Sequence, residues 1–269
     1  TYANPGTTPP AAGATTGPVS GAAAEPVGGT PPGSAARVTQ NGWAPFVLTP
    51  QQQAQVDQVL TAWERHSATI ETFEAKFDRW ETDLVFNREI KSQGEVKYIA
   101  PDKGLIMVDE VPATDNSPGS PAEKWICTDG VVWVYDYENK QLTGHQLPPE
   151  MKGKAIAEGP LPFLFGAKVE SLKRRYFIRL VPPPAGTQGQ LWLEAWPRTR
   201  QDAADFKKAE LILQVNDMSL FAIQLHATSG KERTAYMFSD TKVNARDPFA
   251  WLKQDPFKVT QPTGWKRPI

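Results

Sequence analysis

Few residues of this 269-residue chain have the types and spacing that catalysis or metal binding requires. The three histidines, His66, His145 and His226, are far apart in the sequence, and no two have the spacing of metal ligands on one helix or strand. A single cysteine, Cys127, excludes both a disulfide framework and a thiolate cluster, and its apolar neighbours favour a packed thiol. No nucleophile-elbow, phosphate-loop or zinc-protease motif occurs. We therefore expect a protein that is not an enzyme and that holds neither a cofactor nor a metal.

The charge balance argues against nucleic acid as a partner. Lysines and arginines number 29 and aspartates and glutamates 30, so no basic surplus exists to neutralise phosphates. The run Lys173–Arg175 could attract anionic head groups, although solvated surface charge is the simpler explanation. Trp43, Trp251 and Trp265 fit either a rim that faces a membrane or a partner protein, or chain ends packed onto the domain. No apolar run approaches the roughly 18–20 residues that span a bilayer, so we expect a soluble or externally tethered chain.

Composition divides the chain into two parts. Residues 1–42 consist mostly of Pro, Gly, Ala, Thr and Ser, and they hold almost no large apolar side chain. Folding could not offset the entropy of ordering such a segment, so we expect a disordered tail or linker. It either tethers the protein to a surface or has no role of its own. Residues 43–269 are expected to form a single domain.

That domain is predicted to begin with one amphipathic helix. Thr49, Pro50 and Gln52 form a start signal: a capping hydroxyl, a proline at the first helical position and a glutamine three residues after the cap. The apolar residues that follow at helical spacing are Val56, Val59, Leu60, Trp63 and Ile70.

From Ile70 onward the apolar period changes to two, which is typical of strands. Asp129–Gly130 separates two apolar runs and is typical of a two-residue hairpin turn. Short strands follow one another without the rhythm of β-α-β units, so we expect one antiparallel sheet curled around a core. A second helical stretch interrupts the strands at about Leu161–Lys173. The later strands are predicted at Tyr176–Val181, Leu191–Ala195, Leu211–Val215, Phe221–His226 and Arg233–Phe238.

Several stretches resemble, in the same order, those of one known superfamily. The most specific is Ile126–Asp136, a hairpin with Asp-Gly at its turn. The others are Ser67–Phe77, Gly94–Pro101, Gly159–Phe165 and the terminal group Asn244, Phe257 and Pro262–Trp265. Over residues 50–265 the chain resembles the LolA/LolB-like lipoprotein-carrier superfamily. Within it, an uncharacterised planctomycete group is the most similar, in Gly94–Tyr98, Gly159–Phe165 and Asp202–Phe206.

This resemblance implies a mainly β fold: an open, incomplete antiparallel β-barrel of about 10–11 strands with an N-terminal helix and a short lid-like helical insert. It also implies binding, and further carriage, of lipid, acyl chains or lipoproteins in the periplasm or cell envelope, without catalysis and after removal of a signal peptide. A membrane surface and envelope proteins are the further partners it suggests. The alternatives are an envelope-stress sensor and a structural envelope protein, which would use the same fold with no transported ligand. Ala100 stands where LolA has an arginine that latches its lid, so release is expected to work differently.

An open barrel would present the inward residues of its strands to an acyl chain as a dry apolar wall. The same alternation is expected of a filled barrel without a cavity, so both interpretations stay open. Phe163, Leu164 and Phe165 are expected to form the lid over the opening. The inward, ligand-binding set is predicted as Phe73, Phe77, Val96, Tyr98, Met107, Trp133, Tyr135, Ile178, Leu193, Leu213, Phe221, Ile223 and Phe238.

Overall fold

The computed structural model describes residues 44–111, 120–147, 163, 168–204, 206–245 and 254–266. The predicted tail at residues 1–42 lies outside these ranges, as do Trp43, Leu164, Phe165 and Trp251. The domain boundary at residue 43 therefore stays a prediction.

The predicted first helix is confirmed as α1, Pro50–Ser67. A capping box closes its start: Thr49 Oγ1 accepts the backbone N–H of Gln52 at 3.2 Å, and Gln52 Oε1 accepts that of Thr49 at 2.9 Å. Most of the stability of such a helix comes from packing of its apolar face rather than from its own backbone bonds. The apolar side chains that α1 buries are Val56, Leu60 and Trp63.

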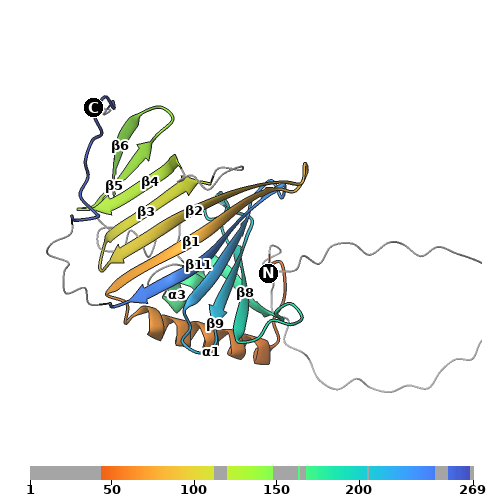
Figure 1. The fold of residues 1–269 in the computed structure, drawn as a ribbon. Coiled ribbons are helices and arrows are strands. Elements are labelled where there is room, and N and C mark those ends of the chain that lie inside the picture. Colours follow the sequence, from red (N-terminus) through yellow and green to blue (C-terminus); the bar gives the residue numbers. More distant parts are fainter. Residues whose placement is uncertain are drawn as a thin grey trace, which may run out of the picture. The chain divides into compact units, whose positions relative to one another are not determined.

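In the described part of the chain, eleven strands form one antiparallel sheet in the order β6-β5-β4-β3-β2-β1-β11-β10-β9-β8-β7. The chain runs from β1 outward to the β6 edge, reaches the β7 edge through α3 (Val169–Arg175), and returns until β11 pairs with β1. Within the described ranges β6 and β7 are the two edges, so the sheet is unclosed (Figure 1). The predicted open antiparallel barrel with an N-terminal helix and a small helical insert is confirmed. The strands are β1 Thr72–Asp83, β2 Arg88–Ile99, β3 Lys103–Glu110, β4 Ser120–Thr128, β5 Val131–Asp136, β6 Gln141–Gln146, β7 Tyr176–Val181, β8 Gln190–Pro197, β9 Lys208–Gln214, β10 Leu220–His226 and β11 Glu232–Val243.

One face of the sheet, here called the inner face, packs against α1 and holds the main core. Residues paired directly across neighbouring strands point to the same face, as Phe77 does with Phe238 of β11 and Gly94 of β2. The Phe77 ring fills the space that a side chain at Gly94 would need. Its edge also meets the rings of Tyr236 and Phe238, with centroids 5.6 and 6.2 Å away. Aromatic packing thus fills the inner face at the centre of the sheet.

The opposite, outer face carries a second apolar cluster beneath residues 254–266, here called the strap. The Tyr135 hydroxyl donates to the Thr260 carbonyl and accepts the Thr260 N–H, both at 3.0 Å. Trp265 packs edge-on against Tyr135 and Tyr137, with centroids 6.0 and 5.1 Å apart. Of the two expectations for Trp265, packing of the chain end onto the domain is therefore the one found. The buried centre of the cluster consists of Leu105, Ile126, Tyr135, Leu142 and Phe257.

This outer cluster corrects part of the predicted inward set. Met107, Trp133 and Tyr135 were expected to point inward, and that prediction is wrong because all three belong to the outer cluster. Their strands are apolar on both faces, so alternation alone could not assign which residues point inward. Phe221 lies where the pairing of β10 with β9 shifts register, and it is half-buried outside both described clusters. A β-bulge interrupts the alternation on which its inward assignment depended.

Candidate functional site

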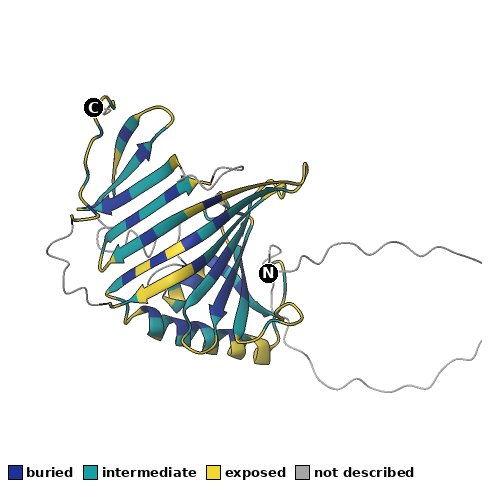
Figure 2. Cartoon of the chain, in the orientation of Figure 1, coloured by how far each residue is buried: buried dark blue, intermediate teal, exposed yellow. Residues whose placement is uncertain are grey.

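The inner face continues beyond the packed core onto β3, β4 and β5. Val96 of β2 begins a row in which each residue pairs with the next across neighbouring strands, followed by Ile106, Trp125 and Val134. Val96 is 2% exposed, whereas the other three are only half-buried. In Figure 2 much of this part of the sheet is coloured as intermediate. We call this partly exposed apolar surface the open wall; its members are Ile106, Trp125, Val132 and Val134.

Nine of the thirteen predicted ligand-binding residues lie in the main core. All of them except Tyr98 are at most 8% exposed, and side chains of α1 and α3 belong to the same cluster. They form a packed floor that the chain itself covers, and their part in ligand binding stays a prediction. The nine are Phe73, Phe77, Val96, Tyr98, Ile178, Leu193, Leu213, Ile223 and Phe238.

The one described residue of the predicted lid, Phe163, is part of the core. It is 1% exposed, and its ring centroid lies 5.2 Å from that of Tyr176 and 6.1 Å from that of Phe206. Tyr176 and Phe206 stack on each other at 5.9 Å. Phe163 is thus an anchor in an aromatic cluster, and the lid role stays a prediction for Leu164 and Phe165, which lie outside the described residues.

A charged centre lies on the inner face of β1. Arg79, two residues beyond Phe77, donates from Nε to Ser92 Oγ at 2.9 Å and from a terminal nitrogen to Glu123 at 2.8 Å. Its other terminal nitrogen lies 3.2 Å from Glu81. Burial lowers the pKa of Arg79, but the hydrogen bond to Glu123 and the charges of Glu123 and Glu81 outweigh it and raise the pKa above its ordinary value.

This Arg79 centre sets one buried cation against two carboxylates that remain partly exposed. The carboxylates compensate the cost of burying the guanidinium, and the group as a whole keeps negative charge on its solvent side. It therefore offers polar contacts beside an apolar wall. The sequence prediction missed it, although the same alternation that turns Phe73 and Phe77 inward also turns Arg79 inward.

A second charged group lies on the outer face of β7–β10. Glu194 lies 2.6 Å from Arg179 and 3.1 Å from Lys208. Lys208 also lies 2.5 Å from Glu210, and His226 Nε2 is 3.5 Å from the same Glu210 oxygen. His226 and Lys208 lower the pKa of Glu210 to about 2 against the effect of burial, which raises it. Arg179, Lys208, Glu194 and Glu210 form ion pairs across three strands, so we assign this network a structural role.

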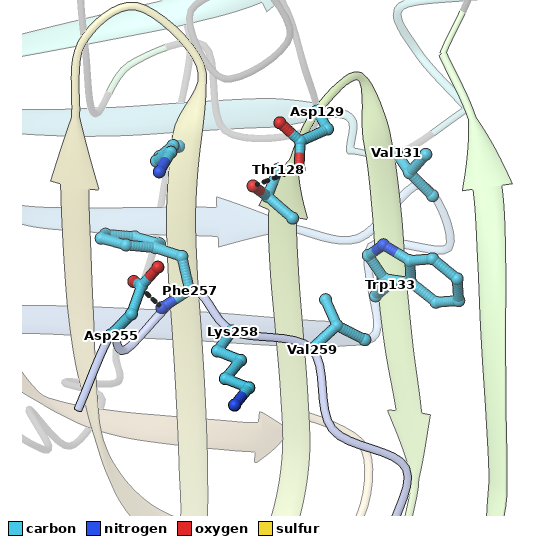
Figure 3. Close-up of a pocket in the computed structure, with 9 residues that line it drawn as sticks. Thr128, Asp129, Val131, Trp133, Asp255, Phe257, Lys258 and Val259 are labelled. Carbon is cyan, nitrogen blue, oxygen red and sulfur yellow. Dashed lines mark hydrogen bonds between the residues drawn. The ribbon is translucent and has the colours of Figure 1, made fainter.

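Two cavities lie between the strap and the outer face, with volumes of about 780 and 390 Å³. Both are bordered by Asp255 and Lys258, and the smaller one also by Trp133 (Figure 3). Asp255 accepts the backbone N–H of Phe257 at 2.9 Å, and Asp129 accepts the Thr128 hydroxyl at 3.3 Å. Because these carboxylates already serve local turns, we regard the cavities as a consequence of how the strap is docked.

The remaining candidate for chemistry, Cys127, is buried, and burial raises the pKa of its thiol to about 11. It is almost wholly protonated at neutral pH, and the predicted packed thiol is confirmed. Among the described residues, no group of three His, Cys, Asp or Glu side chains is placed to hold a metal ion. Within the same part of the chain, no helix combines the length and apolar character needed to cross a bilayer.

No family model matches the sequence, and no curated protein matches it either. Solved structures of similar fold exist at low identity. An uncharacterized conserved protein from Thermus thermophilus is 14% identical, with a TM-score of 0.43 over 79% of this chain and 98% of that one. A LolA superfamily protein from Nitrosomonas europaea is 10% identical, with a TM-score of 0.36 over 71% of this chain and 94% of that one. The lipoprotein LppX from Mycobacterium tuberculosis is 8% identical, with a TM-score of 0.40 over 74% of this chain and 99% of that one. Likeness at this level decides nothing about function.

Proposed function

We propose that this protein binds lipid acyl chains, free or attached to lipoproteins, in the cell envelope, and carries them without chemical change. The observation that carries the proposal is the open wall, where Ile106, Trp125, Val132 and Val134 continue the apolar inner face but remain partly exposed. A contiguous apolar surface beside a packed core is typical of a ligand-binding groove.

An acyl chain is the ligand that such a wall suits best. Each buried CH₂ group contributes about 0.8 kcal/mol, so a chain of about 16 carbons supplies on the order of 10 kcal/mol before the costs of ordering. The tail needs no hydrogen bond from the protein. The Arg79 centre, on the same face, supplies polar contacts for a head group.

The order of the sequence motifs supports an envelope location. Between two membranes, acyl chains cannot cross the aqueous space without a carrier that shields them. The resemblance to the LolA/LolB-like superfamily, and within it to the uncharacterised planctomycete group, belongs to this proposal as a prediction from the motifs. The periplasmic location is part of the same proposal. The proposed partners are lipids or lipoproteins, together with the membranes or envelope proteins that exchange them.

A second candidate is an envelope-stress sensor or a structural envelope protein with no transported ligand. The observation that favours it is the packed floor, since eight of its nine predicted ligand-binding residues are at most 8% exposed. In that case the open wall would be a site for a protein partner.

A pair of variants on one strand tests the first candidate. Val134 lies on the inner face of β5 and Val131 on the outer face, and both are half-buried. Val134→Asp places a charge in the path of the acyl chain, and we expect it to weaken binding of a fluorescent fatty acid at least about tenfold. Val131→Asp carries a similar structural cost on the other face and is expected to change the affinity by less than about twofold.

Equal affinities for the two variants would exclude the open wall as the binding surface. If the unaltered protein itself binds no fatty acid, the carrier proposal fails, and the sensor or structural role becomes the better account.

A further inference from the structure

The tip of the β1–β2 hairpin exposes three consecutive apolar side chains. Leu84, Val85 and Phe86 are 50%, 59% and 73% exposed, and Ile90 nearby is 54% exposed. Turns are normally built from Gly, Pro, Asn, Asp and Ser, so an apolar triplet at this position needs an explanation. The hairpin extends beyond the neighbouring strands in Figure 1, and Figure 2 colours its end as exposed.

The backbone N–H groups of this triplet are hydrogen-bonded within the protein. Leu84 N–H donates to the Lys231 carbonyl at 2.7 Å. Asp83 Oδ1 accepts the N–H groups of both Val85 and Phe86, at 2.8 and 3.0 Å. The hydrocarbon part of a bilayer offers no hydrogen-bond partner, so backbone groups that enter it must be satisfied internally. All three N–H groups of the triplet meet that condition.

Size and charge favour a lipid surface over a protein groove. Four apolar side chains on a convex hairpin fall well short of the roughly 800 Å² per partner that a stable protein interface buries. The charges around the base of the tip alternate in sign, so neither an anionic surface nor a strongly charged partner is preferred. They belong to Asp83, Arg88, Glu89, Lys231, Glu232 and Arg233.

We propose that this apolar tip, Leu84–Phe86 with Ile90, inserts into the outer part of a lipid bilayer and docks the protein there without spanning it. Ile90 pairs with Glu81, whose carboxylate contacts Arg79. Docking therefore brings the end of the inner face that carries the Arg79 centre to the membrane. The value of bringing the Arg79 centre to the membrane rests on the proposed lipid-binding function. Insertion of the tip does not depend on that function.

Flotation of the full chain with phosphatidylcholine vesicles tests the insertion. Phe86→Ser removes the most exposed ring of the tip, and we expect it to lower the partition coefficient about tenfold or more. Val47→Ser is the matched control because Val47 is 63% exposed outside the hairpin, and it should partition as the unaltered protein does. Because the nearby charges balance, raising the salt from about 0.1 to about 0.5 M should leave partitioning nearly unchanged.

A fluorescent label reports the depth of the tip directly. Val85→Cys can be labelled selectively with an environment-sensitive thiol dye because the buried Cys127 thiol, with its pKa of about 11, stays protonated. We expect a blue shift and brighter emission on addition of the vesicles. The same dye at Val47→Cys should not respond.

The proposal is overturned if the unaltered chain does not float with the vesicles, or if Phe86→Ser floats as well as it does. Retention by an envelope protein in place of the vesicles would also overturn it and assign the tip to a protein partner. Fatty-acid binding measured on the same samples keeps the two proposals apart. Phe86→Ser should partition onto the vesicles at least about tenfold more weakly and keep its affinity for the fatty acid.

Discussion

Arg79 and Glu210 show how the two faces of the sheet accommodate charge. On the inner face, Arg79 is buried against two carboxylates that stay in contact with water. On the outer face, the carboxylate of Glu210 is shared by Lys208 and His226. Burying a charge removes it from water, which is costly. In both places charged partners compensate part of this cost. Only the Arg79 centre lies on the face that we propose for the ligand.

Glu210 is expected to make the fold sensitive to acid within a defined range. Its pKa falls from the ordinary 4.5 to about 2 in the folded protein, so its contribution to stability is complete above about pH 4.5. That contribution is lost as the pH drops from about 4.5 towards 2. After allowance for screening by solvent, Glu210→Gln should lower the free energy of unfolding by about 1–2 kcal/mol at pH 7 and by almost nothing near pH 2. Urea unfolding at a series of pH values measures this, and a constant difference between the two proteins would contradict it.

At the scale of elements, the sequence predicted what local patterns encode. The capping residues Thr49 and Gln52 fixed the start of α1, and alternation with turn chemistry indicated the strands and the antiparallel class. Which residues of β3 and β5 point inward could not be predicted because both faces of these strands are apolar. The outer faces lie beneath the strap, and the inner faces continue from the core into the open wall. Docking of the strap depends on contacts such as that of Tyr135 with Thr260, which are 125 residues apart. A local pattern of apolar residues cannot indicate contacts between residues so distant in the sequence.

One hydroxyl is expected to contribute measurably to docking of the strap. Tyr135→Phe removes the group that bonds both the carbonyl and the N–H of Thr260, so it should destabilise the docked strap by about 1–2 kcal/mol. Hydrogen exchange should show faster exchange of the Thr260 amide. Tyr137→Phe keeps the ring contact with Trp265 and serves as the control, with exchange at Thr260 unchanged. Equal protection of Thr260 in both variants would show that the apolar contacts and the backbone hydrogen bonds of Lys266 with Lys140 and Leu142 hold the strap without this hydroxyl.

At the scale of the whole domain, one continuous inner face combines two regions of different packing. Near α1 the packed floor is covered by the chain itself, whereas the open wall on β3–β5 keeps its apolar side chains partly exposed. The sheet order brings both onto one surface because β1 joins the β2–β6 half to the β7–β11 half. A molecule built this way can lose or gain an apolar ligand at the wall while the floor stays packed. The apolar hairpin tip adds the surface by which we propose that it reaches a membrane.

The central claim, that the inner face holds an acyl chain, is tested most directly by native mass spectrometry of the full chain purified from an envelope fraction, with lipid extraction of the same sample. The account predicts on the order of one acyl lipid per chain, and a much smaller lipid-bound fraction for Val134→Asp than for Val131→Asp. A protein that carries no lipid, or two variants that carry equal amounts, would contradict it.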